Sequence, residues 1–167
     1  MKTRSIRIEG NLAYVTLTQG YIAVVDSDDA YLVEGFNWCA QVSRSTVYAR
    51  RSDCTSGRGR FVLMHRLIST APDDMHVDHI DGDGLNNCRS NMRLATNQQN
   101  QHNQGIARHN TSGFKGVYFH NRLKKWQAGI KMNNIAYHLG TYSTAELAHA
   151  AYVEASARLH GEFSRTS

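Results

Sequence analysis

Proline, cysteine and long apolar runs are scarce in this chain of 167 residues, which has one proline and three cysteines. So little proline, with moderate glycine, argues against a disordered or fibrous chain. Cys39, Cys54 and Cys88 form no CxxC pair, which argues against a disulfide framework or a structural zinc site and favours reduced thiols in a cytoplasmic protein. No apolar run reaches the ~18 residues of a membrane span, and "MKTRSIRIEG" lacks the apolar segment of a signal peptide.

Acidic residues are absent from a long central stretch. Between Gly84 and Ala145 the chain has eight arginines and lysines and no aspartate or glutamate in 62 residues, within a net charge of +5. Because ordinary surfaces mix both signs, such a stretch favours a phosphate-rich partner. A basic, solvated face is the alternative.

The first part of the chain, residues 5–68, reads mostly as strands. "SIRIEG", "LAYVTLT" and "YIAVVD" carry β-branched or alternating apolar residues, and a short helix is expected after Asp26 or Ser27. "TVYARRS" and "RFVLMHRLI" flank a glycine-rich turn and predict a hairpin, although "MHRLIS" could begin a short helix instead. The arginines of this region fit phosphate contacts and a solvated edge equally well: Arg44, Arg50, Arg51, Arg58 and Arg60.

The remainder predicts two further units. Residues 76–104 read as strand, glycine-rich loop, strand and a helix capped by Thr96 with Gln99, and residues 105–112 read as a linker. Three strands follow in "FKGVYFH", "KWQAGIKM" and "IAYHLGTY", and then a helix with Ser143 or Thr144 as N-cap and an alanine-rich face. The fold class expected is α+β.

Histidine and aspartate gather at "HVDHIDGD", where Asp78 and His79 are neighbours on a strand. Hydrolysis of a phosphodiester needs a base for water, for which histidine is suited, and a hard cation held by oxygen ligands. If Asp78 binds the cation, His79 points to the other side of the strand and can act on water. Asn91 could orient its ring and Asn100 could complete the metal site.

Blander interpretations exist for this segment. The acids could form a solvated turn, and an EF-hand is excluded because the twelfth residue from Asp81 is Met92. Asp81 and Asp83 are expected to be loop residues, and His65 and His76 to be structural or DNA-contacting rather than catalytic.

"VDHIDGDGLNN" followed by "SNMRLATNQQN", with "LMHRLI" upstream, resembles the ββα-metal motif of HNH endonucleases of the phage and homing type. The resemblance implies His79 as general base, Asn91 as the residue that orients it, and Asp78 and Asn100 as ligands of one divalent ion, Mg²⁺ or Mn²⁺. His102 and Asn103 stay open as alternatives to Asn100, although His102 points about 200° away from it on a helix.

Residues 113–167 resemble the AP2/ERF DNA-binding domain through "GFKGVYF", "KKWQAGI", "LGTYSTAELAHAAY" and "LHGEF". The resemblance implies a three-stranded antiparallel sheet packed on one helix, with the other face on DNA. Strand alternation would direct seven residues to the helix: Val117, Phe119, Trp126, Ala128, Ile130, Tyr137 and Leu139. The residues expected to contact DNA are Lys115, Tyr118, His120, Arg122, Lys124, Lys125, Gln127, Lys131 and His138.

The sequence therefore predicts a metal-dependent DNA endonuclease of the cytoplasm of a bacterial or phage-infected cell. Residues 1–104 would hold a β-rich region and the nuclease motif, and residues 113–167 the DNA-binding domain. The partner would be double-stranded DNA, with no membrane and no small-molecule cofactor, for a monomer or weak dimer. The alternatives are a DNA-binding regulator without catalysis and a protein that binds or cleaves RNA.

Overall fold

The structure is a computed structural model that describes residues 4–43, 46–53, 59–107, 109–133 and 135–166. Cys54, Arg44 and Arg58 lie outside the described residues. The chain divides into two compact units, Met1–Thr96 and Asn97–Ser167. The boundary between the units thus lies before the helix of the predicted nuclease motif. The linker predicted from the sequence, residues 105–112, lies after that helix. No helix of the described residues is long and apolar enough to cross a membrane.

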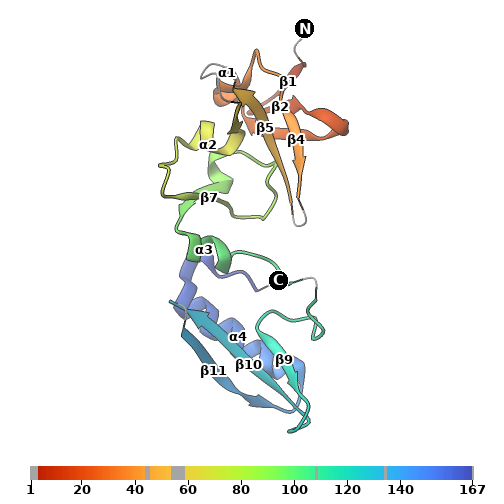
Figure 1. Ribbon diagram of the computed structural model, residues 1–167, viewed down its shortest axis with the longest axis vertical. Coiled ribbons are helices and arrows are strands. Elements are labelled where there is room, and N and C mark those ends of the chain that lie inside the picture. Colours follow the sequence, from red (N-terminus) through yellow and green to blue (C-terminus); the bar gives the residue numbers. More distant parts are fainter. Residues whose placement is uncertain (1–3, 44–45, 54–58, 108, 134, 167) are drawn as a thin grey trace. The chain divides into compact units, whose positions relative to one another are not determined.

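The described residues of the first unit form two three-stranded antiparallel sheets and a two-stranded one (Figure 1). The first sheet and the short helical segments around it are β1 (Ile6–Glu9), β2 (Leu12–Thr16), η1 (Thr18–Gly20), β3 (Ile22–Asp26), η2 (Ser27–Asp29) and α1 (Ala30–Val33). The second sheet and its helix are β4 (Cys39–Val42), β5 (Val47–Asp53), β6 (Arg60–Leu63) and α2 (Met64–Ser69). The last elements are β7 (His76–His79), η3 (Arg89–Asn91) and β8 (Met92–Ala95).

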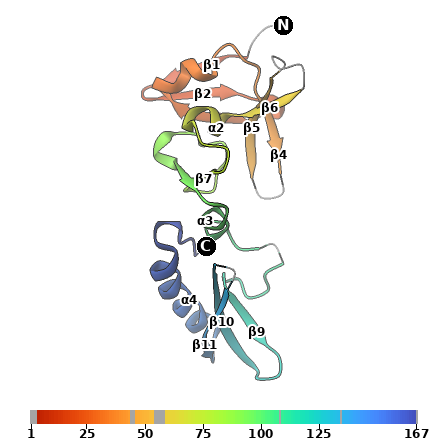
Figure 2. The ribbon, with the colours of Figure 1, turned by 60° about the vertical axis from the view of Figure 1, so that its left-hand side comes forward.

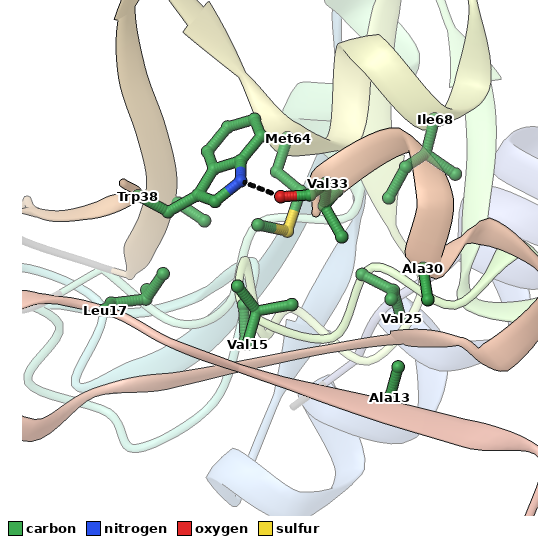
Figure 3. Close-up of a cluster of buried hydrophobic side chains, with 11 residues drawn as sticks. Ala13, Val15, Leu17, Val25, Ala30, Val33, Trp38, Met64 and Ile68 are labelled. Carbon is green, nitrogen blue, oxygen red and sulfur yellow. Dashed lines mark hydrogen bonds between the residues drawn. The ribbon is translucent and has the colours of Figure 1, made fainter. Parts of the chain in front are cut away.

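These elements confirm the strand pattern, the helical turn after Asp26 and the β5–β6 hairpin. Their shared core packs the β1–β3 sheet against α1 and α2 (Figure 3). Trp38 is fully buried there, and its indole Nε1 donates to the Val33 carbonyl at 2.9 Å. The described cysteines Cys39 and Cys88 are free thiols, as expected.

The second unit contains α3 (Asn97–His102), β9 (Val117–His120), β10 (Lys125–Met132), β11 (Ile135–Tyr142), α4 (Ala145–His160) and η4 (Gly161–Phe163). Its antiparallel sheet has the order β11–β10–β9, and α4 covers one face (Figures 1 and 2). The N-cap of α4 is Thr144, whose hydroxyl accepts from the Leu147 N–H at 3.3 Å.

The prediction that one face of this sheet packs on the helix is confirmed for the residues at the middle of the sheet. Val117, Ala128 and Ile130 are buried with the small residues of α4. Phe119 and Tyr137, also expected to face the helix, lie opposite Trp126 and Ile130 on the same face of the sheet, but they are 40% and 46% exposed. They lie on the outer strands β9 and β11, where this face of the sheet is only partly covered.

Candidate active site

The β7–β8 hairpin positions the two residues at the centre of the candidate site. Its register pairs Asp78 with Arg93 and His79 with Met92. Asp78 is 4% exposed and His79 is 5% exposed. Burial of a carboxylate and an imidazole side by side is costly, so each needs a partner in the protein.

The partner of Asp78 is Arg93, whose Nε donates to Oδ2 at 2.8 Å in an ion pair that is itself largely buried. The sequence analysis missed this arginine. The register of the hairpin would have pointed to it, because residues directly opposite on two antiparallel strands place their side chains on one face. Arg93 compensates the buried charge of Asp78 and fixes the direction of its carboxylate.

The imidazole of His79 is held by Asn87, which is fully buried. Asn87 Oδ1 lies 3.2 Å from His79 Nε2, while Asn87 Nδ2 donates to the Leu85 carbonyl at 3.1 Å. Because the amide nitrogen is directed to a carbonyl, the oxygen must face the ring, and Nε2 carries the hydrogen. The neutral ring then has its lone pair on Nδ1.

Asn87 is in place because its loop adds to the edge of β3. The Val24 N–H donates to the Leu85 carbonyl at 2.9 Å, and the Asn87 N–H donates to the Val24 carbonyl at 2.7 Å. A strand far away in sequence thus sets the position of the amide. No local pattern distinguishes Asn87 from its neighbour Asn86, which explains why the sequence analysis missed it.

Asn91, predicted to orient His79, has both amide hydrogens committed elsewhere. They go to Asp81 Oδ1 and to the Asn86 carbonyl, each at 2.9 Å, while Asn91 Oδ1 accepts from the Asp81 N–H at 3.1 Å. Asn91 therefore shapes the loop between the strands rather than donating to the ring. The expectation that Asp81 is a loop residue fits these bonds.

Burial acts on the pKa values of His79 and Asp81 in one direction, and their polar and charged neighbours act in the other. Burial lowers the pKa of His79, and the bond to Asn87 and the carboxylates of Asp81, Asp78 and Asp83 raise it without offsetting the burial. Burial raises the pKa of Asp81, but hydrogen bonds from Asp83, Asn86 and Asn91 lower it overall. At neutral pH the site therefore combines a neutral His79 imidazole with an ionised Asp81 carboxylate.

Two further rings surround His79. His65 is 7% exposed on α2, and its ring centroid lies 5.3 Å from that of His79 in an edge-to-face arrangement. Tyr48 lies 5.2 Å from His65 and 6.0 Å from His79. Tyr48 also fills the space beside Gly84, where a Cβ would lie 2.6 Å from the tyrosine ring. The glycine loop thus closes against Tyr48.

His65 should make the protein less stable in acid. Burial, followed by the charges of His79 and Arg66, lowers the pKa of His65 from 6.5 to about 3. Between these values the unfolded chain binds a proton that the folded chain does not, so stability falls as the pH falls, by up to about 1.4 kcal/mol per unit. The His65→Phe variant should lose this part of the dependence in urea unfolding from pH 7 to pH 4. An unchanged pH profile would show that the fold does not hold His65 neutral.

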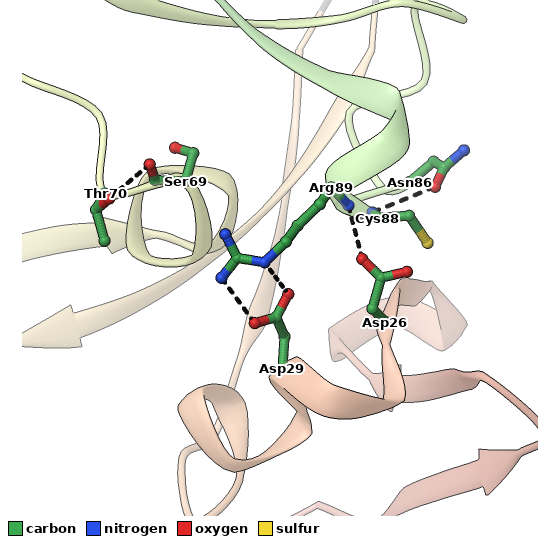
Figure 4. A network of polar contacts seen from close by, with 7 residues as sticks. All are labelled: Asp26, Asp29, Ser69, Thr70, Asn86, Cys88 and Arg89. Atoms are coloured by element: carbon green, nitrogen blue, oxygen red, sulfur yellow. Dashed lines mark hydrogen bonds and ion pairs between the residues drawn. The ribbon is translucent and has the colours of Figure 1, made fainter.

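A polar network attaches the end of the loop to the β1–β3 sheet and the helical turn after it (Figure 4). Arg89 Nε and Nη2 donate to the two oxygens of the buried Asp29 at 2.7 and 2.8 Å, and the Arg89 N–H donates to Asp26 Oδ2 at 2.8 Å. Bidentate pairs of this kind are rigid. The segment from Leu85 to Arg89, which carries Asn87, is therefore bound to β3 and to the helical turn after it.

The predicted metal ligands are an incomplete set by themselves. Among the described residues no group of three or more His, Cys, Asp or Glu could hold a metal ion. Asp78 and Asn100 would supply a carboxylate and an amide oxygen, and Asn100 lies on α3. Such hard oxygen donors fit Mg²⁺, which usually takes one or two carboxylates and completes its shell with water and substrate phosphate.

Most residues predicted to contact DNA lie on the face of the second unit away from α4 or in the β9–β10 turn. Gln127 pairs with Tyr118 and Lys125 with His120 across β9–β10, and His138 lies opposite Gly129 on β11. The exposed members of the set are Tyr118, Arg122, Lys124, Lys125, Lys131 and His138. Lys115 is different, because its ammonium donates to three backbone carbonyls.

Comparison with known proteins gives the class of protein to which this chain is similar. A family model described as HNH endonuclease matches residues 62–102. The chain is 36% identical over 162 residues to the uncharacterized HNH endonuclease L560 of Acanthamoeba polyphaga mimivirus, over 92% of this chain and 80% of that protein. It is 30% identical over 95 residues to protein 3.8 of Escherichia phage T7, over 56% of this chain and 77% of that protein. No solved structure matches. The chain therefore belongs to the HNH endonuclease family.

Proposed function

We propose that this protein is a metal-dependent DNA endonuclease with His79 as its general base. The observation that carries the proposal is the setting of His79: a buried, neutral imidazole that follows the buried Asp78 on the same strand, with Nε2 held by Asn87. A base of this kind must be unprotonated at working pH and must point in a fixed direction. The membership of the HNH family and the acid-free stretch support DNA as the substrate.

The chemistry follows from the ring's tautomer. His79 Nδ1 takes a proton from water, and the resulting hydroxide attacks the phosphorus as the bond to the 3′ oxygen breaks. The 3′ oxygen leaves with the bonding electron pair and takes a proton from solvent, so the products carry a 5′-phosphate and a 3′-hydroxyl. A divalent ion, Mg²⁺ or Mn²⁺, held by Asp78 and Asn100, would offset the charge that develops on the phosphate and the leaving oxygen. Asn91 acts through the loop that carries Asn87.

The second unit would direct the nuclease to its site. We propose, on the resemblance to AP2/ERF domains, that the face away from α4 lies on DNA, with Arg122, Lys124 and Lys125 on phosphates. Lys115 is left out of this set because its donors are committed. With one active site per chain, the product expected of a monomer or weak dimer is a nick, made in the cytoplasm of a bacterial or phage-infected cell.

Supercoiled plasmid that carries DNA from the protein's own genetic neighbourhood tests the proposal. Incubation with Mg²⁺ should give open circles with 5′-phosphate ends, and EDTA should abolish them. Plasmid that is retarded on a gel yet uncut with Mg²⁺ or Mn²⁺ would favour a DNA-binding regulator instead. A preference for RNA over DNA would favour the RNA-directed alternative.

Removal of two lysines should weaken binding to all DNA sequences to a similar extent, because phosphate contacts do not depend on the bases. Lys124→Ala with Lys125→Ala removes two exposed cations, and each phosphate contact contributes about 0.9 to the slope of log K against log salt. We expect a slope smaller by about one to two units in binding titrations with EDTA present. Arg158→Ala, on the exposed side of α4, is the charge control and should leave the slope unchanged. Equal slopes for the double variant and the wild type would remove these lysines from the phosphate contacts.

A further inference from the structure

Lys115 is a lysine of the acid-free stretch that does not face solvent as a free cation. Its Nζ donates to the carbonyls of His102 at 2.6 Å, Gln104 at 2.6 Å and Arg165 at 3.0 Å. An ammonium has three hydrogens, and these three bonds use all of them. Lys115 therefore has no donor left for a phosphate in this arrangement.

The first of these carbonyls belongs to the last residue of α3. The last carbonyls of a helix have no partner within the helix and carry its partial negative charge, so a cation placed there is stabilising. Burial, with the charge of Arg165 added, lowers the pKa of Lys115 to about 8. The ammonium is thus drawn away from water to serve the end of α3 and the C-terminal segment together.

A second set of contacts holds the same end of α3. The ring of His102 stacks on that of His160, the last residue of α4, with centroids 3.6 Å apart and an interplanar angle of 13°. His160 is fixed in turn, with Nδ1 3.3 Å from Ser156 Oγ and Nε2 3.3 Å from the Lys131 carbonyl. The C-terminal end of α3 is therefore held within the second unit by two side chains, Lys115 and His160.

We propose that Lys115 is a positioning residue of the nuclease: it fixes the C-terminal end of α3 and thereby the direction of Asn100. This inference rests on the proposed function, in which Asn100 is a metal ligand. Asn100 lies within the last turn of this six-residue helix, so a displacement of its end moves the amide directly. Groups that hold a ligand in place commonly contribute ~10–100-fold to metal affinity.

The test compares Lys115→Met with Lys124→Met. The first keeps the aliphatic stem and removes the three donors, while the second removes an exposed cation proposed to contact DNA. Mn²⁺ affinity is measured by electron paramagnetic resonance without DNA, α3 order by amide hydrogen exchange, and DNA binding by titration in EDTA. Lys115→Met should bind Mn²⁺ about tenfold more weakly and exchange the α3 amides faster, with DNA binding unchanged. Lys124→Met should weaken only DNA binding.

Each other result has a definite meaning. Unchanged Mn²⁺ affinity or unchanged α3 exchange in Lys115→Met would overturn the inference while the nuclease proposal stands. A loss of DNA binding equal to that of Lys124→Met would make Lys115 a DNA contact and would overturn it too. Wild-type protein that binds no Mn²⁺ would remove the metal from the proposed function and the inference with it. Wild-type protein that binds Mn²⁺ but cuts no DNA would refute the nuclease, and of the inference only the part in which Lys115 holds α3 and its metal ligand would stand.

Discussion

The His79→Ala variant should cleave DNA ~10²–10⁴-fold more slowly than the wild type, the usual contribution of a general base. The loss should appear in single-turnover rates at saturating Mg²⁺, because the substitution removes the group that accepts the proton of water. DNA affinity in EDTA should stay the same. His76→Ala, an exposed histidine at the start of the same strand, is the matched control and should keep most of its cleavage.

The pH dependence of the wild type gives the same role a second test. Burial lowers the pKa of His79, so more than half of the imidazole is unprotonated at pH 6.5. The midpoint of the fall in cleavage should therefore lie below that pH, the fall should approach one power of ten per unit, and it should be absent in His79→Ala. If the alanine variant lost DNA binding as much as cleavage, a structural role for His79 would replace the catalytic one.

Loss of the amide that holds the ring should have the second largest effect. Asn87→Ala removes the acceptor 3.2 Å from His79 Nε2, and the ring is then free to adopt the other tautomer or to turn. Loss of an orienting partner commonly costs ~10–100-fold, and we expect a loss of this size in the single-turnover rate. Circular dichroism and urea unfolding would show whether the buried cavity alone destabilises the fold.

A second substitution at this position separates orientation from stability. Asn87→Asp keeps an acceptor near Nε2 but adds a negative charge, which favours the imidazolium and raises the pKa of His79. The cleavage profile should then shift to higher pH, and activity lost at neutral pH should return in alkaline buffer. An unshifted profile in Asn87→Asp would mean that this amide does not act on the base.

Asn87, and not Asn91, is the amide that contacts the His79 ring in this chain. The side-chain amide of Asn91 donates to Asp81 and to the Asn86 carbonyl, so it stabilises the turn of the loop. Asn87 meets the ring because its backbone bonds to β3. The orientation of the His79 ring therefore depends on a strand outside the matched family segment, which begins at residue 62.

The sequence by itself determined the parts of this protein that depend on near neighbours. Alternation of apolar residues predicts β1 to β3, because one face of a strand must be buried. Thr144 and the alanines after it predict the start of α4, because a hydroxyl and small residues suit a helix cap and close packing on a sheet. The order of strand, glycine loop, strand and helix in residues 76–104 can be predicted in the same way.

Only the tertiary structure decided which distant groups meet. His65 and Tyr48 pack beside His79, Asp29 bonds with Arg89, and Lys115 is drawn from the expected DNA face to the end of α3. Each of these contacts satisfies a buried polar or aromatic group, and many side chains along the chain could satisfy it equally well. The side chain that makes each contact is set by how distant parts of the chain pack together. Residue type and spacing along the sequence do not determine this packing.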